Sequence, residues 1–222
     1  GIEYDITNHL TINVESYYKD FSQIVVVNRN KTSLTDADFT TETGKAYGID
    51  FNFKYDFNKL YLWGTYSYGH VNRFDGEQEY PTVFDRRHNV NLLASYNLSK
   101  NGDFSVSARW NMGSGFPFTK SQGFYDNINY LQGIGTDYTT ENPDNVGIIY
   151  SDIRNGGRLP YYHRLDLSIQ KTFEISKYVS TEITASVTNA YDRANIFYFD
   201  RIRYNRVDQL PILPSLNVKF NF

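Results

Sequence analysis

The chain of 222 residues combines 20 Tyr and 16 Phe with a mean hydropathy of only −0.54. Disordered chains carry few aromatic residues, and soluble domains this polar normally carry fewer than this one does. The absence of cysteine excludes a disulfide framework and thiolate metal sites. A net charge of −3 gives no general electrostatic footprint for nucleic acid. No apolar window long enough for a transmembrane helix occurs.

Nine segments alternate between apolar and polar residues, the period of a half-buried strand. Leu10, Ile12 and Val14, for example, alternate with polar residues. In chain order, we expect strands at residues 1–7, 10–27, 44–57, 60–73, 87–98, 104–115, 162–173, 179–191 and 214–222. Several are longer than the roughly 5–6 residues of typical globular strands. Because helical periodicity is almost absent, the sequence predicts an all-β fold.

The connections between these segments alternate in length. Short turns are expected at residues 8–9, 58–59, 99–103 and 175–178, and long loops at residues 28–43, 74–86, 116–161 and 192–209. Tight turns at one end and large loops at the other are typical of a transmembrane antiparallel β-barrel of the bacterial outer membrane. There the short turns are periplasmic and the long loops extracellular. The alternative, a soluble β-sandwich or jelly roll, is disfavoured because its loops need not sort by length.

The number of expected strands indicates whether they form a whole barrel. Bacterial single-chain barrels have an even number of strands, and a sheet survives in the bilayer only when it is closed. Nine strands therefore predict that residues 1–222 are the C-terminal portion of a larger barrel, with the earlier strands absent from this sequence. The alternative is a wrongly placed strand boundary. A hairpin within residues 116–161 would add two strands and leave the count odd.

Four stretches resemble a known family: "TGKAYGIDFNFKYDF" (43–57), "FDRRHNVNLLASYNL" (84–98), "GGRLPYYHRLDLSIQKTFEI" (156–175) and "QLPILPSLNVKFNF" (209–222). They are similar, in the same order, to strands of TonB-dependent outer-membrane receptors of the Bacteroidetes type. The resemblance implies a 22-strand barrel with an N-terminal plug domain, which is absent from this sequence. It also implies energy supplied by the TonB–ExbB–ExbD system.

By this resemblance, the expected function is import of a scarce ligand: a siderophore, cobalamin, a peptide or a glycan. One alternative is a barrel that acts as a structural or scaffolding subunit of an outer-membrane complex without transport. Another is an outer-membrane enzyme, for which Asp85 beside His88 is the nearest candidate pair. The sequence shows no activated nucleophile or paired-carboxylate signature, so we expect no catalytic residues. We also expect no metal site, with His70, His88 and His163 as interfacial side chains.

Arginine gathers where strands are expected to meet the outer surface. One interpretation is contact with an anionic ligand or with lipopolysaccharide phosphates, which suit the guanidinium fork. The other interpretation, which we favour, is a set of ion pairs that brace the loops, for example with Asp85, Asp200 and Asp208. The candidate ligand or partner contacts are Arg86, Arg87, His88, Phe124, Tyr125, Tyr130, Tyr138, Arg201, Arg203 and Arg206.

The loop at residues 116–161 is too long for a simple connector. Its aromatic residues could bind a ligand, grip a partner or cover the barrel mouth. Asp137, Glu141 and Asp144 could hold Ca²⁺ through oxygen ligands, although their spacing matches no known loop motif. No other cofactor is expected.

The last segment alternates Leu216, Val218, Phe220 and Phe222 with polar residues, and the first set is expected to face lipid. By resemblance, such a terminal aromatic strand is the signal read by the barrel-assembly machinery, although the usual glycine a few residues earlier is not evident. The expected partners are therefore outer-membrane lipid and lipopolysaccharide, the TonB system through the plug, and the assembly machinery. A surface lipoprotein or another outer-membrane complex subunit is a further expected partner, and nucleic acid is not expected.

Overall fold

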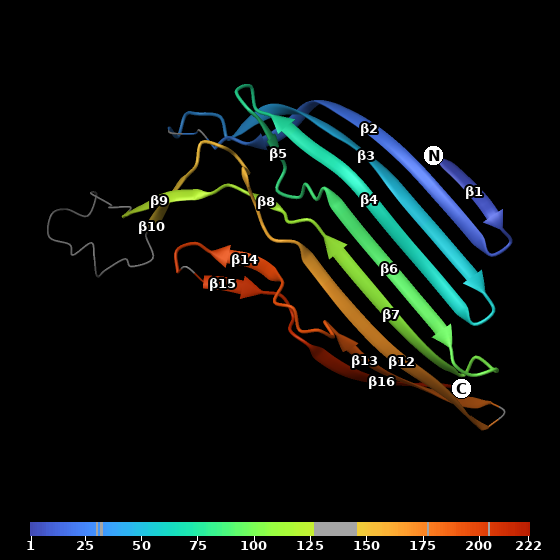
Figure 1. Ribbon diagram of the computed structural model, residues 1–222. Coiled ribbons are helices and arrows are strands. Elements are labelled where there is room, and N and C mark those ends of the chain that lie inside the picture. The colour runs from blue at the N-terminus through green and yellow to red at the C-terminus, as the bar shows by residue number, and fades with distance from the viewer. Residues whose placement is uncertain (30, 32, 127–145, 177, 204) are drawn as a thin grey trace.

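A computed structural model describes residues 1–29, 31, 33–126, 146–176, 178–203 and 205–222 of the chain. In these residues nine long strands form one antiparallel sheet, each strand paired with its neighbours along the path (Figure 1). In sheet order the strands are β1 (Ile2–Thr7), β2 (Leu10–Val27), β3 (Phe39–Phe57), β4 (Leu60–Phe74), β6 (His88–Asn97), β7 (Phe104–Gly113), β12 (Tyr162–Ser176), β13 (Val179–Thr188) and β16 (Leu213–Asn221). The nine predicted strands and the all-β class are confirmed.

Shorter strands lie in the long connections, gathered beyond one end of the sheet (Figure 1). They are β5 (Glu79–Pro81), which pairs with β4, and the pairs β8 (Pro117–Phe118) with β11 (Gly157–Arg158), β9 (Ser121–Asp126) with β10 (Val146–Tyr150), and β14 (Ile196–Asp200) with β15 (Asn205–Asp208). The β9–β10 pair is the kind of hairpin considered for residues 116–161, and it lies outside the nine-strand sheet. The β14–β15 hairpin was not expected.

Several strand boundaries differ from the expected ones, such as the end of β12 at Ser176 rather than at residue 173, and two of the differences have identifiable reasons. β3 begins at Phe39 rather than at residue 44, because its first residues pair with the far end of β2, where Val26 is opposite Thr40. β13 ends at Thr188 rather than at residue 191. The next residue, Asn189, has a φ of 55°, a left-handed conformation that breaks the strand.

One face of the sheet is polar from strand to strand. The Asn91 side chain donates to Thr65 Oγ1 (3.1 Å) and accepts from Asn111 Nδ2 (2.5 Å), which links β4, β6 and β7. Closer to the short turns, serine hydroxyls pair between β7 and β12 and between β13 and β16, both at 2.6 Å. These bonds cross neighbouring strands at register positions, so the polar face is a continuous surface of hydrogen-bonding groups.

The opposite face is apolar and exposed. One row across six strands contains Ile12, Phe53, Gly64, Leu92, Trp110 and Leu165. Tyr47 and Phe57, near the two ends of this band on β3, are ten positions apart. Ten residues span about 33 Å along a strand, or about 25 Å in height at the tilt of a membrane barrel. That height matches the apolar band of a membrane-spanning β-sheet.

Three tyrosine–histidine pairs lie at the loop end of the apolar face. The Tyr66 hydroxyl contacts His88 Nδ1 (2.9 Å), and the Tyr68 hydroxyl contacts His70 Nε2 (2.8 Å). On β12, His163 Nδ1 contacts the hydroxyl of Tyr191 at 2.7 Å. Rings with one polar edge suit the boundary between hydrocarbon and water. The described residues include no helix long and apolar enough to cross a membrane.

A tyrosine covers two glycines on the polar face, where three strands approach closely. Tyr17 of β2 is opposite Gly48 of β3, which is opposite Gly69 of β4. A Cβ atom at Gly48 would lie 2.7 Å from the Tyr17 hydroxyl oxygen and 2.5 Å from the backbone oxygen of Tyr68. Glycine is therefore required at this position by close packing.

We expect Gly48→Ala to destabilise the barrel by about 1–3 kcal/mol, the usual range for overpacking. The measurement is the thermal midpoint at which the detergent-purified protein loses its folded gel mobility. Gly123→Ala on β9 is the matched control, because its added Cβ would meet its nearest neighbour at 3.7 Å. Equal midpoints for the two variants would contradict this account of Gly48.

Candidate functional site

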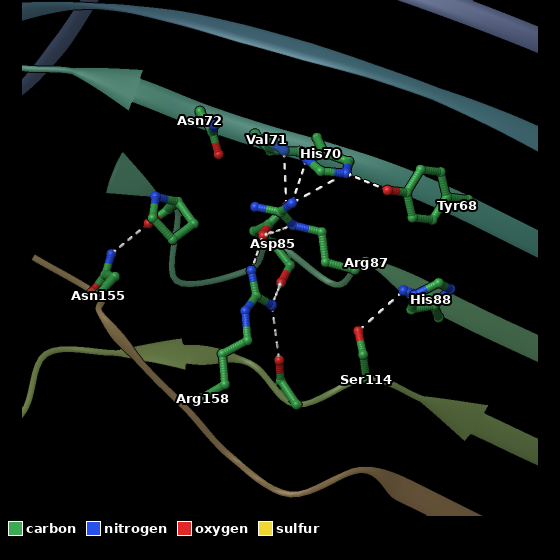
Figure 2. A network of polar contacts seen from close by, with 12 residues as sticks. Tyr68, His70, Val71, Asn72, Asp85, Arg87, His88, Ser114, Asn155 and Arg158 are labelled. Carbon is green, nitrogen blue, oxygen red and sulfur yellow. Dashed lines mark hydrogen bonds and ion pairs between the residues drawn. The ribbon is translucent and has the colours of Figure 1, made fainter. Parts of the chain in front are cut away.

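A buried carboxylate organises the loop end of the sheet. Asp85, in the connection between β5 and β6, is 0% exposed. Its carboxylate accepts a hydrogen bond from the Val71 N–H (2.9 Å) and forms ion pairs with Arg87 (2.7 Å) and Arg158 (Figure 2). Arg158 also donates to the backbone oxygens of Asp85 and Gly115. The Asp85 side chain therefore joins β4, the β5–β6 connection and β11.

The position of Asp85 follows from a break in strand pairing. β5 pairs with β4 from Asn72 onward, whereas β6 pairs with β4 only up to Tyr68. The Val71 N–H lies in this gap, without a strand carbonyl to accept its hydrogen bond, and the Asp85 carboxylate takes that role. An unpaired backbone donor at this depth would be costly.

Burial raises the pKa of the Asp85 carboxyl, but hydrogen bonds from Arg87, Arg158 and the Val71 N–H outweigh burial and hold that pKa below its usual value. The carboxylate therefore stays charged over the ordinary pH range. Its two guanidinium partners replace the water that it loses on burial.

A second ionic cluster holds part of the long connection between β7 and β12 against the polar face. Arg154 Nη1 contacts Glu42 of β3 (3.1 Å) and Asp75 of the β4–β5 connection (2.7 Å). Its guanidinium carbon lies 3.9 Å from the centre of the Tyr80 ring, and the Tyr80 hydroxyl donates to Glu42 at 2.5 Å. Burial, as the larger cause, and this hydrogen bond to Glu42 raise the pKa of Tyr80 to about 12. The hydroxyl therefore remains a donor at physiological pH.

Neighbouring backbone contacts reinforce this attachment. The Arg154 N–H donates to the Gln78 side chain (3.1 Å), and Gln78 Nε2 donates to the Asp152 oxygen (3.0 Å). Asn155 donates from its amide to the Pro81 oxygen at 2.8 Å. Residues 152–155 are thus joined to residues 75–81 and to β3, and this stretch of the long connection is folded onto the polar face.

A hollow of about 560 Å³ lies beside these clusters, at the loop ends of β7 and β12. Its lining residues are Arg86, Gly115, Phe116, Leu159, Pro160, Tyr161, Tyr162, Arg193, Ala194, Asn195, Ile196, Phe197, Arg206 and Gln209. Its size is within the usual range for small-molecule sites. Arg86 lies on the polar face, where a Cβ at Gly113 would meet its guanidinium at 2.5 Å.

The arginines predicted as candidate contacts have different partners in the structure. Three of the expected bracing pairs are present: Arg87 with Asp85, Arg203 with Asp200 (3.6 Å) and Arg206 with Asp208 (2.5 Å). Arg201 instead lies over the rings of Phe118 and Tyr150. Arg86 has no ion pair with any described residue. His88 contacts Tyr66 rather than Asp85, so these two do not form the pair considered for an enzyme.

The remaining candidates occupy different places. Phe124 and Tyr125 lie on β9, with Tyr125 exposed. Tyr130, Tyr138 and the proposed calcium ligands Asp137, Glu141 and Asp144 lie outside the described residues. Within the described residues, no three histidine or acidic side chains are placed to hold a metal ion. Leu216, Val218 and Phe220 lie on β16 at apolar-face positions, Phe222 follows the strand, and their role in assembly stays a prediction.

The residues that hold the loops together were mostly not predicted. Glu42, Arg154, Arg158 and Tyr80 carry no local signal, because their partners are distant in sequence. Arg158 lies in the stretch "GGRLP", where two glycines precede it, but nothing there identifies Asp85 as its partner.

Comparison with known proteins decides the family. The family model described as TonB dependent receptor-like, beta-barrel, matches residues 1–190. The chain belongs to the TonB-dependent receptor β-barrel family. Family membership places it in the bacterial outer membrane, and the apolar face is then the lipid-facing surface of the barrel wall. The polar face correspondingly lines the lumen.

Solved structures of this kind share the fold. The ferric-catecholate import receptor Fiu from K12 E. coli matches with a TM-score of 0.62 and 11% identity, over 99% of this chain and 26% of that protein. The ferripyoverdine receptor of Pseudomonas aeruginosa, bound to ferripyoverdine, matches with a TM-score of 0.57 and 9% identity, over 97% of this chain and 25% of that protein. The chain thus spans about a quarter of each receptor. A search among curated protein sequences gave no match.

We expect Asp85→Asn to destabilise the loop end of the receptor barrel by about 3 kcal/mol, because two partly buried guanidinium groups lose their carboxylate. Asp38→Asn is the matched control, since Asp38 pairs with Lys31 in an exposed position (2.7 Å) and should contribute less than about 1 kcal/mol. Thermal unfolding of the detergent-purified protein measures both. Equal losses for the two variants would contradict the central role of Asp85.

The difference between wild type and Asp85→Asn should depend on pH. Because the folded pKa of Asp85 is depressed, its stabilisation is complete above the unfolded pKa of about 3.9. It is lost as the pH falls through the lower folded value. The difference in stability between the two proteins should therefore shrink progressively as the pH falls below about 4, and a difference that widened there would argue against the ionised carboxylate.

We expect Arg154→Gln to release residues 152–155 from the barrel wall, because Glu42 and Asp75 lose their shared cation. Amide hydrogen exchange in this stretch should become roughly 100-fold faster, corresponding to about 3 kcal/mol for a broken buried pair. Arg203→Gln is the control, since that side chain is 74% exposed in its ion pair. Unchanged exchange in Arg154→Gln would show that the backbone contacts suffice.

Proposed function

We propose that the chain is part of a TonB-dependent receptor that imports a scarce ligand across the outer membrane. The observation that carries this proposal is the family match over residues 1–190. The chain contributes wall, lumen lining and loop-end surface. The chain spans about a quarter of each solved receptor, and the proposed import also requires a plug and contact with the TonB–ExbB–ExbD system.

The proposed orientation follows from the two ends of the sheet. The short turns face the periplasm and the long connections face outside, as in other outer-membrane barrels. Ligand capture then occurs among the long connections, where Asp85 and Arg154 hold the backbone in place. Phosphates of lipopolysaccharide surround this end of the barrel, and the barrel-assembly machinery acts on the last strand.

Ferric chelates are the first ligands to test. Two similar solved structures are receptors for ferric-catecholate import and for ferripyoverdine. At 11% and 9% identity they support the fold, and the ligand of this chain need not be the same. Cobalamin, peptides and glycans are therefore tested in parallel.

We expect the full-length receptor to support uptake of at least one of these ligands in a bacterial host that lacks its own receptors. Uptake should disappear when TonB is deleted from the host, because the imported ligand must pass a plug that only energised TonB displaces. The measurement is accumulation of radiolabelled ferric chelates or cobalamin, with labelled peptides and glycans as further substrates.

Absence of uptake for every ligand, together with a stoichiometric outer-membrane partner in purified complexes, would overturn the transport proposal. That outcome would favour the alternative in which the barrel is a structural or scaffolding subunit. Uptake that persists without TonB would overturn the proposed energy source.

A further inference from the structure

The hollow at the loop ends of β7 and β12 has an unusual balance of charge. Three of its lining residues are arginines, and none of its described lining residues is acidic. The chain as a whole has 25 acidic and 22 basic residues and a net charge of −3. Several other arginines at this end, among them Arg87, Arg154 and Arg158, each contact a carboxylate. A cationic cavity in an acidic chain needs a separate explanation.

Arg86 is the clearest member of the set. Its guanidinium carbon lies 4.3 Å from the centre of the Phe116 ring and 5.7 Å from that of Tyr162. It makes no ion pair with any described residue, and its buried Nε–H has no acceptor among them. Burial lowers the pKa of this guanidinium. A desolvated cation without a counter-charge is costly to the free protein, and an anion in the hollow would remove that cost.

Arg193, another lining residue of the hollow, repeats the pattern. It donates to the Tyr161 backbone oxygen at 3.0 Å, whereas its buried Nε–H has no acceptor among the described residues. Arg206 differs, because Asp208 balances its charge at 2.5 Å. Two of the three arginines in the hollow therefore carry charge that the described part of the chain leaves unbalanced.

The side chains that line the hollow indicate the shape of the ligand that would carry the anionic group. Phe116, Tyr161, Tyr162 and Phe197 provide aromatic surface around the guanidinium groups. Flat rings pack favourably against such walls, and a guanidinium fork matches the two oxygens of a carboxylate.

We propose that this hollow binds a carboxylate attached to a flat ring, with Arg86 as its principal cation and Arg193 as the second. This assignment rests on the import function proposed above and deepens it, because it names a chemical class for the group that the loop end captures. The ring lies between the aromatic walls, and the carboxylate accepts from guanidinium N–H groups that have no other acceptor.

Benzoate is the probe for the full-length receptor in detergent, observed by saturation-transfer NMR and titrated by its signal. Benzamide, the uncharged isostere, and cyclohexanecarboxylate, which has the charge without the flat ring, are titrated in the same way. We expect benzoate to bind most tightly, and both analogues to bind at least several-fold more weakly. Equal signals for benzoate and benzamide would indicate partition into detergent and would overturn the proposal.

Arg86→Gln should weaken benzoate binding roughly tenfold or more, the usual effect of losing a hydrogen bond to a charged group. Arg109→Gln is the matched control, since it removes the same charge from the polar face at a position outside the hollow. Arg193→Gln should weaken binding by a smaller factor. If Arg86→Gln fails to fold, Arg86→Lys keeps the charge without the fork and should still bind more weakly than wild type.

The remaining outcomes test the ligand assignment and the transport proposal independently. Failure of the wild-type receptor to bind benzoate would overturn the proposed ligand class. A carboxylate from another segment of the receptor would then be the counter-charge of Arg86. The test of TonB-dependent uptake does not depend on this result. Benzoate binding that depends on Arg86, in a receptor that imports nothing, would support the assignment and overturn transport. Binding unaffected by both Arg86→Gln and Arg193→Gln would place benzoate elsewhere and overturn the assignment.

Discussion

Backbone hydrogen bonding is the constraint on which this structure depends. In hydrocarbon every N–H and C=O must be paired within the protein, because no water is available to replace a missing partner. Seven inner strands meet this demand by a ladder that runs from β1 to β16, whose outer edges have no partner strand among the described residues. Where the ladder is interrupted, between β5 and β6, a side chain supplies the missing acceptor. Asp85 is therefore part of the sheet's hydrogen bonding as well as a centre of charge.

The two faces of the sheet follow from a single alternation in the sequence. Because successive side chains point to opposite faces, residues such as Leu92 face lipid, and their neighbours, such as Asn91, face the lumen. The lumen face then has the polar groups needed to attach loops, and the Arg154 cluster forms there. Glu42 anchors Arg154 because β3 places its carboxylate on that face. The wall of the barrel thus determines where its loops can be held.

The alternation allowed much of the fold to be predicted, and distance along the chain explains most of what was missed. Strands were recognisable because each carries its own pattern, whereas β8 and β11 pair across a long connection and have almost no pattern. Arg87 and Arg206 each pair with an acid two positions away, which sequence reasoning can propose. Arg154 and Glu42 are 112 positions apart, and only folding brings them together. That Arg86 has no ion-pair partner among the described residues is likewise visible only in three dimensions.

The Asp85 carboxylate, which three groups share, affects which substitutions the loop end can accept. Asp85 serves Arg87, Arg158 and the Val71 N–H at once, so the effect of replacing one partner depends on whether the others are present. Residues in one such network show interaction energies of about 0.5–3 kcal/mol rather than additive effects. Positions 85, 87 and 158 are therefore expected to accept substitutions as a group more readily than singly, although 73 residues separate the first from the last.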